Sequence, residues 1–187
     1  MSLTRAIEID GRPLKIYDDL VPLPEVKRLT NAFLNAAFVC DEVARPDTYA
    51  ARHWQLTIPL ETARQLVVFQ PTLKVLQDFP ERSHYRILRV YCNHASYGDM
   101  LFTHTDVHEG KEGLTALWYI APEWNVEWGG ETMLYDRNQD AVACVTPRPG
   151  RLAIFDGTIL HAGRPPNRIC YAPRYTLAFK LEPPPDA

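Results

Sequence analysis

The chain has 187 residues, 46% of them hydrophobic, and a formal net charge of −3. This length suits one well-buried core and is short for two, so we expect a single domain over residues 1–187. The acidic balance gives no footprint for nucleic acid or for an anionic membrane, and no signal-like or membrane-spanning apolar run occurs, so the sequence predicts a soluble, cytoplasmic protein that binds neither.

The first half of the chain carries the helical patterns. Residues 14–18 alternate like a strand, and from Pro24 onward apolar side chains recur at helical spacing, which predicts an amphipathic helix of about 15 residues. Residues 52–59 alternate again and predict a strand. Residues 61–79 predict a second helical stretch that is bent or broken at Pro71.

The second half consists of short runs rich in branched and aromatic residues, separated by turn residues such as "EWGG" and "RPG". The expected strands are residues 85–92, 99–106, 114–121, 131–136, 141–147, 151–157, 158–163 and 174–181. This series predicts a mainly β (α+β) fold with a β-sandwich or barrel-like jelly roll as its core. The core would span about residues 85–181, with a strand-and-helix support over 1–84 and a frayed proline-rich tail over 182–187.

The stretch "FTHTD" places His104 and Asp106 two residues apart, so on a strand both side chains would share one face and could bind one ion. Alternatively, both residues are merely solvated near a strand end. Among the other histidines, His161 is the best third ligand, because it lies in an otherwise apolar strand before a proline turn. It could equally be a satisfied core histidine. Two histidines and one carboxylate are the ligand set of non-heme iron(II) oxygenases.

Arg174 begins the run "RYTLAFKL", in which Arg174, Thr176 and Ala178 share one face and three larger apolar side chains share the other. The apolar face is expected to be packed, which would direct the guanidinium into the barrel. An inward arginine needs an anion, and a dicarboxylate would match its planar fork. The alternative is an arginine that reaches solvent from the strand end.

Together these residues resemble the prolyl-4-hydroxylase-like branch of the iron(II)- and 2-oxoglutarate-dependent oxygenases. The resemblance covers about residues 85–181, in order: Gly98 six residues before the first histidine, "HTD", "LWYIAPEWNVEWGGETMLYD", "PRPGRLAIFDGTILHAGRPP" and "RYTLAFKL". The leading "IYDDLVPLPEVKRL" is also similar to the strand–helix entry of that branch. No single motif is decisive, but their order and spacing together are specific.

The resemblance implies that His104, Asp106 and His161 bind Fe(II), and that Arg174 holds the distal carboxylate of the cosubstrate 2-oxoglutarate. Tyr119 falls where relatives often place a tyrosine on the same carboxylate, although it could be a core aromatic. The implied reaction uses O2, converts 2-oxoglutarate to succinate and CO2, and oxidises a C–H bond. The carboxylate of the ligand set favours hydroxylation over halogenation, while desaturation and cyclisation stay open.

Two features depart from the family pattern. Relatives have a tyrosine shortly before the glycine, whereas here Tyr91, His94 and Tyr97 all precede Gly98; Tyr91 is a candidate for the cosubstrate pocket, and which of the three lines it stays open. The segment between the second histidine and Arg174 is also longer than in many relatives, so it could shape the substrate entrance or be only a long turn.

The sequence favours a small-molecule substrate, such as an amino acid or a biosynthetic intermediate, because no separate recognition domain is evident. A residue of a protein or peptide is the second choice. His108, Glu131 and Arg164 are candidate substrate residues at the rim. Two alternatives to an oxygenase stay open: a cupin-like metalloprotein that does not use 2-oxoglutarate, and a non-catalytic jelly-roll binding module. The oligomeric state cannot be inferred from the sequence.

Overall fold

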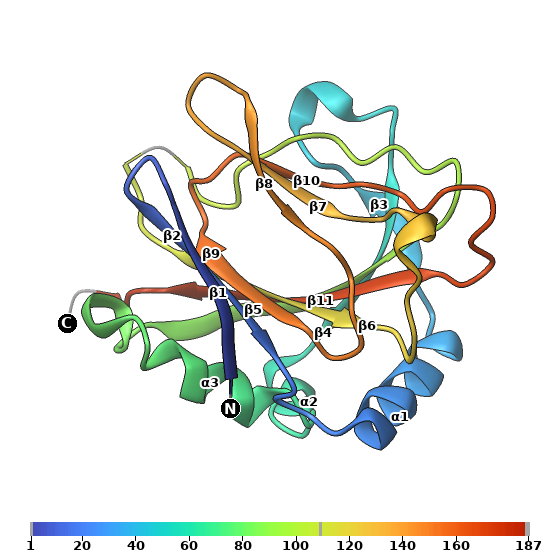
Figure 1. The fold of residues 1–187 in the computed structure, drawn as a ribbon, viewed down its shortest axis with the longest axis horizontal. Coiled ribbons are helices and arrows are strands. Elements are labelled where there is room, and N and C mark those ends of the chain that lie inside the picture. Colours follow the sequence, from blue (N-terminus) through green and yellow to red (C-terminus); the bar gives the residue numbers. More distant parts are fainter. Residues whose placement is uncertain (1, 109, 186–187) are drawn as a thin grey trace.

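The computed structural model describes residues 2–108 and 110–185. In this part of the chain, eleven strands form two antiparallel sheets, and the helices lie on one side of them (Figure 1). The strands are β1 (Ser2–Ile9), β2 (Arg12–Asp18), β3 (Val39–Glu42), β4 (His53–Ile58), β5 (Arg86–Ala95), β6 (Leu114–Ile120), β7 (Thr132–Tyr135), β8 (Ala141–Val145), β9 (Leu152–Asp156), β10 (His161–Gly163) and β11 (Arg174–Glu182).

The larger sheet has eight strands in the order β1-β2-β9-β6-β11-β5-β4-β3, and the smaller has three in the order β10-β7-β8. The smaller sheet lies over one face of the larger sheet, as Figure 1 shows. The mainly β, jelly-roll architecture predicted from the sequence is confirmed.

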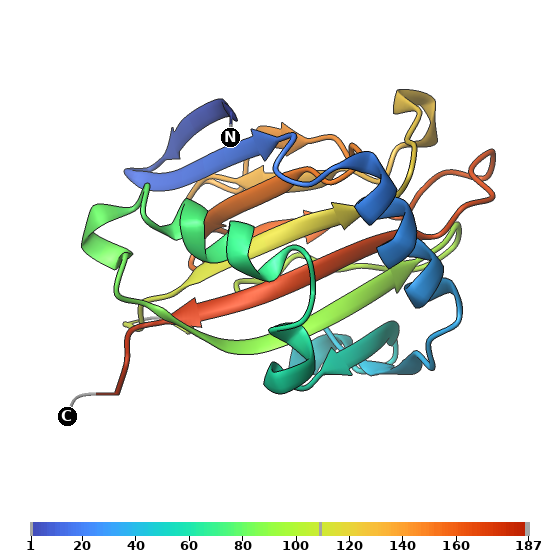
Figure 2. The same cartoon turned by 90° about the horizontal axis from the view of Figure 1, so that it is seen from below.

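Three α-helices cover the opposite face of the larger sheet (Figure 2). They are α1 (Leu23–Leu34), α2 (Leu60–Ala63) and α3 (Phe69–Leu76), and single 3-10 turns occur at η1 (Pro46–Thr48), η2 (Pro80–Arg82) and η3 (Val126–Trp128). In α1 the buried side chains Val26, Leu29 and Phe33 recur at spacings of three and four, which places them on one face. None of the helices in the described residues is long and apolar enough to cross a membrane.

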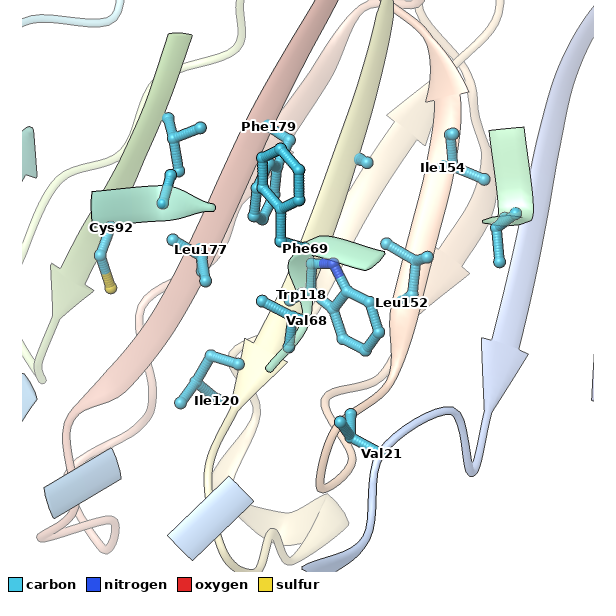
Figure 3. Close-up of a cluster of buried hydrophobic side chains, with 14 of the residues drawn as sticks. Val21, Val68, Phe69, Cys92, Trp118, Ile120, Leu152, Ile154, Leu177 and Phe179 are labelled. Atoms are coloured by element: carbon cyan, nitrogen blue, oxygen red, sulfur yellow. The ribbon is translucent and has the colours of Figure 1, made fainter. Parts of the chain in front are cut away.

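The main hydrophobic core lies between these helices and the larger sheet. Figure 3 shows Trp118, Leu177 and Phe179 from the sheet packed against Val68 and Phe69 at the start of α3. Because side chains alternate along a strand, the residues between them on β6 and β11 point to the other face, toward the smaller sheet. The helices therefore take up one face of the sheet and leave the other for a site.

Two expectations from the sequence are wrong. Residues 99–106 do not form a strand: they are an extended loop between β5 and β6 whose one bridge joins His104 to His161. The loop lies beside β10, which has only three residues, so a longer ladder has no strand to pair with. The second helical stretch breaks over residues 64–68 and not at Pro71, which lies in the first turn of α3, where a missing N–H costs little.

Two strands, β1 and β3, were not expected from the sequence, and both lie at the edges of the larger sheet. At the other end of the chain, residues 183–185 lie in no regular element, and residues 186–187 of the expected tail lie outside the described residues.

Candidate metal centre

His104, Asp106 and His161 come together although two segments of the chain supply them. His104 and His161 exchange two backbone hydrogen bonds, of 2.9 and 3.0 Å, and the amide of Asp106 donates to the carbonyl of Gly157 at 2.8 Å. These bonds fix the extended loop alongside β10 and the turn before it. One nitrogen of each imidazole and one carboxylate oxygen then lie within 4.8 Å of one another.

Both imidazoles are oriented by their own backbone. The Nδ1 atom of His104 lies 3.0 Å from the carbonyl oxygen of Phe102, and that of His161 lies 2.9 Å from the carbonyl oxygen of Ile159. Since a carbonyl can only accept, each Nδ1 carries the proton and each Nε2 keeps its lone pair. Hydrogen bonds of this kind fix the tautomer and ring orientation of metal-ligating histidines.

The spacing of the three donor groups fits one ion. Nε2 of His104 lies 3.5 Å from Oδ1 of Asp106, and Nε2 of His161 lies 3.4 Å from Oδ2. Ligands that bind one ion at ~2.1 Å and at right angles are ~3 Å apart, so a small inward movement would complete the set. The residues present therefore fit a divalent metal with three coordination positions left open.

The charge states also suit metal binding. Burial lowers the pKa of His161 to about 4, so its imidazole is neutral at neutral pH. Burial alone would raise the pKa of Asp106, but Lys180 and the two histidines outweigh it and hold that pKa well below its usual value. The site thus offers a neutral imidazole from His161 and an ionised carboxylate from Asp106.

Arg174 is buried at the start of β11, with only 3% of the residue exposed. Its guanidinium donates to the carbonyl of Gly130 and to the hydroxyls of Thr132, at 2.9 Å, and Thr176, at 3.4 Å. Burial lowers the pKa of Arg174 from its usual value, but an arginine stays charged. Among the described residues, no carboxylate lies within ion-pair distance of it, so the charge has no anionic partner.

One cavity joins this arginine to the histidines. Arg174 and Thr132 line it near one end, and His104, His161 and Lys180 line it elsewhere. Gly163 borders the cavity beside the arginine, where an added Cβ would lie 3.2 Å from an Arg174 guanidinium nitrogen. A dicarboxylate could therefore reach from the guanidinium to the two histidines within one cavity.

The structure distinguishes the candidate tyrosines. Tyr91 lines the cavity, whereas His94 faces the other side of the sheet, beside Phe38 and Tyr175, and Tyr97 is 65% exposed. Tyr119 is buried beneath the Arg174 guanidinium, and its hydroxyl donates to Thr132 at 2.7 Å. A contact of Tyr119 with the cosubstrate stays a prediction, because Thr132, and not Tyr119, borders the cavity.

The three candidate substrate residues lie away from this cavity. His108 borders a separate hollow with Lys111 and Glu112, on the other side of Asp106. Arg164 donates to the hydroxyl of Tyr135 on an exposed loop, and its amide binds the carbonyl of Glu131. None of the three is brought to the cavity wall, so their substrate role stays a prediction.

The cavity wall contains polar residues to which the sequence assigned no binding role there. They are His53, Asn93, Thr115, Thr132, Thr176 and Lys180. Lys180 follows the same alternation along β11 that directed attention to Arg174, and this signal could have identified it. His53 had been only one of several possible third metal ligands, and the structure places it on the cavity wall instead.

Residues 90–180 match the family model of the 2OG-Fe(II) oxygenase superfamily. No curated protein matches the sequence significantly. This match and the shared fold confirm the similarity to the 2OG-Fe(II) oxygenases that the sequence indicated; the cofactor of these enzymes is Fe(II) and their cosubstrate is 2-oxoglutarate. The protein is therefore an oxygenase, and the cupin-like and non-catalytic interpretations are set aside.

Solved structures of low sequence identity share the fold. A Pseudomonas putida prolyl-4-hydroxylase has 14% identity and a TM-score of 0.67, over 91% of this chain and 92% of that one. The collagen prolyl hydroxylase of Paramecium bursaria Chlorella virus-1, in its 2-oxoglutarate complex, has 16% identity and a TM-score of 0.66, over 94% and 98%. The epimerase SnoN, in complex with Fe3+, alpha ketoglutarate and nogalamycin RO, has 15% identity and a TM-score of 0.65, over 91% and 78%.

Proposed function

We propose that this oxygenase hydroxylates a C–H bond of a small molecule, such as an amino acid or a biosynthetic intermediate. The reaction consumes O2 and 2-oxoglutarate and yields the hydroxylated product, succinate and CO2, so that one oxygen atom goes to the substrate and the other to succinate. The observation that carries the proposal is a buried arginine that has no carboxylate within ion-pair distance among the described residues and that lines the same cavity as the two histidines of the His–Asp–His cluster.

Each residue has a defined role in this proposal. His104, Asp106 and His161 hold Fe(II), which when bound supplies the redox chemistry that activates dioxygen. Arg174 and the hydroxyl of Thr176 bind the distal carboxylate of 2-oxoglutarate and direct its keto-acid end toward the metal ligands. The buried walls around them exclude water from this part of the cavity.

A small substrate is supported by what borders the rest of the cavity. Its wall there includes Leu101, Phe102 and His53. Arg45 lies over the Phe102 ring at 5.8 Å and donates to the hydroxyl of Thr103 at 3.2 Å, so the segment near η1 lies across the loop that carries the metal ligands. This arrangement leaves limited room for a substrate beside the metal.

A peptide residue is the second candidate, and one feature favours it. The loop between β10 and β11 presents Ile169 and Tyr171, which are 52% and 95% exposed. Exposed apolar side chains near a cavity can dock an extended chain. Succinate release measured against a panel of free amino acids and short peptides, with the product located by mass spectrometry, decides between the two. Turnover with peptides alone would contradict the small-molecule proposal.

The site itself is tested by anaerobic titration of the Fe(II)-loaded protein with 2-oxoglutarate, following the visible charge-transfer band of the chelate. We expect a saturable band in the wild type. His104→Ala should lose it because a metal ligand is gone. Arg174→Ala should need at least roughly tenfold more 2-oxoglutarate, the loss expected for a buried charge-assisted pair.

Arg164→Ala is the matched control, since it removes an exposed arginine that does not border the cavity and makes no contact with the metal ligands or Arg174. Its titration should equal that of the wild type. Bound metal with no band in the wild type would contradict the use of 2-oxoglutarate by these residues, and a band that survives His104→Ala would contradict the proposed ligand set.

A further inference from the structure

Lys180 is a second buried cation on β11, on the same face as Arg174 and Thr176. Only 13% of its side chain is exposed. Its ammonium contacts Oδ2 of Asp106, donates to the hydroxyl of Thr115 at 3.0 Å, and lies 5.5 Å from the centre of the Tyr91 ring. Lys180 is thus directed into the site and not toward solvent.

The two carboxylate oxygens of Asp106 have different hydrogen-bond partners. Oδ2 takes both the ammonium of Lys180 and the hydroxyl of Thr115, the latter at 2.5 Å. Oδ1 faces Nε2 of His104 and receives neither of these donors, whereas Oδ2, which bears both, also lies 3.4 Å from Nε2 of His161. Because Oδ2 is held by these two donors, Oδ1 is the oxygen that is free to bind a metal ion. The ammonium also cancels the one negative charge that the ligand set holds.

Lys180 is charged in this position. Its ammonium contacts the Asp106 carboxylate directly, so the two side chains form a buried ion pair. A buried ammonium beside a buried carboxylate stabilises the protein before any metal arrives, because neither charge is left uncompensated. Once a divalent cation binds, the same ammonium repels it across a short distance in a poorly screened site.

We propose that Lys180 is a positioning residue that serves as a fixed counter-cation for Asp106: it holds the carboxylate in one orientation in the metal-free protein, and it weakens the binding of the metal. This inference rests on the proposed metal site. It predicts that loss of the charge changes stability and metal affinity in opposite directions, which a purely structural lysine would not do. Removal of the charge should destabilise the metal-free protein and, at the same time, tighten metal binding.

The test uses Lys180→Met, which keeps the length of the side chain and removes the charge. Two quantities are measured on the full chain: the Tm of the metal-free protein in a chelator, and the Kd for Co2+ followed by its visible absorption. We expect a lower Tm for the metal-free variant and a Kd for Co2+ at least tenfold lower than that of the wild type.

Lys180→Gln is the second variant, in case Lys180→Met does not fold. Its amide can still donate to Asp106 and Thr115, so folding is retained, and because it is also uncharged the same gain in Co2+ affinity is expected. Lys15→Met is the matched control. Lys15 is a partly buried lysine that contacts the carbonyl of Asp78 and the ring of Phe79, away from the metal ligands. It should lower the Tm without changing the Kd.

The outcomes separate the two proposals. If the wild type binds Co2+ and neither Lys180 variant binds it more tightly, the counter-cation role is overturned and the metal site stands. A metal-free Lys180→Gln protein as stable as the wild type, with unchanged affinity, also overturns it. If the wild type binds no divalent ion, the proposed function fails first, and the inference fails with it.

Discussion

Lys180 and Arg174 are both buried cations on β11, but only one of them is paired with a carboxylate. Lys180 has a carboxylate partner in Asp106, whereas Arg174 has backbone and hydroxyl acceptors and no carboxylate. An uncompensated buried guanidinium is costly unless an anion joins it. The two cations of the cavity therefore differ: the charge of Lys180 is compensated by the protein, and the charge of Arg174 is available to an anionic ligand.

Gly163 gives a test at this scale. An added Cβ would meet the guanidinium nitrogens of Arg174 at 3.2 and 3.3 Å. Because Gly130, Thr132 and Thr176 already hold the guanidinium, it can yield only by weakening those bonds. Gly163→Ala should raise the Kd for 2-oxoglutarate roughly tenfold, or about 1.4 kcal/mol, and leave the metal affinity unchanged.

Isothermal titration of the metal-loaded protein with 2-oxoglutarate measures this effect. In an Arg174→Ala background, Gly163→Ala should have little further effect, since the side chain it displaces is absent. Additive losses in the double variant would show that Gly163 acts by another route.

The residues of the metal centre were predictable from the sequence because each carries its own local signal. His104 and Asp106 are two apart, His161 lies in an apolar run, and Arg174 lies on the small-residue face of its strand. Lys180 was not predicted. The alternation along β11 places it on the face of Arg174, but a lysine near a strand end is expected to extend to solvent, and its contact with Asp106 depends on how β11 lies against the loop between β5 and β6.

At the scale of the elements, the loop between β5 and β6 shows where the sequence patterns predict the wrong secondary structure. Residues 99–106 have strand-like composition, yet the strand beside them, β10, has only three residues, and a single bridge forms. His104 and Asp106 still meet the other histidine because single backbone bonds hold the loop to β10. The alternation argument thus reached the correct pair of residues through an element that does not exist.

The attachment of α3 to the larger sheet has one polar contact, from Nε1 of Trp118 to the hydroxyl of Thr72 at 2.9 Å, in a fully buried position (Figure 3 shows the indole). Thr72→Val should lower the free energy of unfolding by about 1–3 kcal/mol, because the indole N–H is left without an acceptor. Urea unfolding followed by circular dichroism measures it.

Thr30→Val is the matched control for that change. Thr30 is also buried in a helix and also donates to the carbonyl four residues earlier, at 2.9 Å, but no side-chain hydrogen bond reaches it. Thr30→Val should lower the free energy of unfolding much less than Thr72→Val does. In a Trp118→Phe background, Thr72→Val should also cost less, since no donor remains; an equal cost in both backgrounds would contradict the contact.

At the scale of the whole molecule, the larger sheet separates two environments. Its helix-covered face is apolar and holds the main core, whereas its other face carries the threonines, His53 and the cations of the cavity beside a second apolar cluster that packs against the smaller sheet. This division follows from the period of two along each strand, and it was predicted for β11 alone. Which strands lie side by side was not predictable, because the register depends on pairings between distant segments.

The pH dependence of stability is a property of the whole molecule, and His161 contributes to it. Its pKa is about 4 in the folded protein and 6.5 in the unfolded chain. As pH falls from 6.5 to 4, the unfolded chain takes up the proton and the folded protein does not, so the free energy of unfolding decreases, by up to about 3 kcal/mol. Above pH 6.5 this contribution is constant.

Urea unfolding of the metal-free protein between pH 4.5 and 7.5 measures this slope. His161→Gln should show a shallower decrease, since the titrating group is gone. A residual slope is expected from His53 and His94, whose pKa values burial also lowers. Asp106 acts only at lower pH, since its folded pKa lies well below 3.8. Identical slopes in both proteins would contradict the lowered pKa of His161.

The position of β11 also bears on when the site comes into existence. β5 and β6 follow each other along the chain, but β11, the last strand of the described residues, lies between them (Figure 1). A chain still being synthesised carries both histidines and Asp106 before it has the strand that brings their surroundings together. Such late, long-range closure is slow compared with local structure. Metal loading is thus a step that follows folding, and a nascent chain would have only a loose set of ligands to offer.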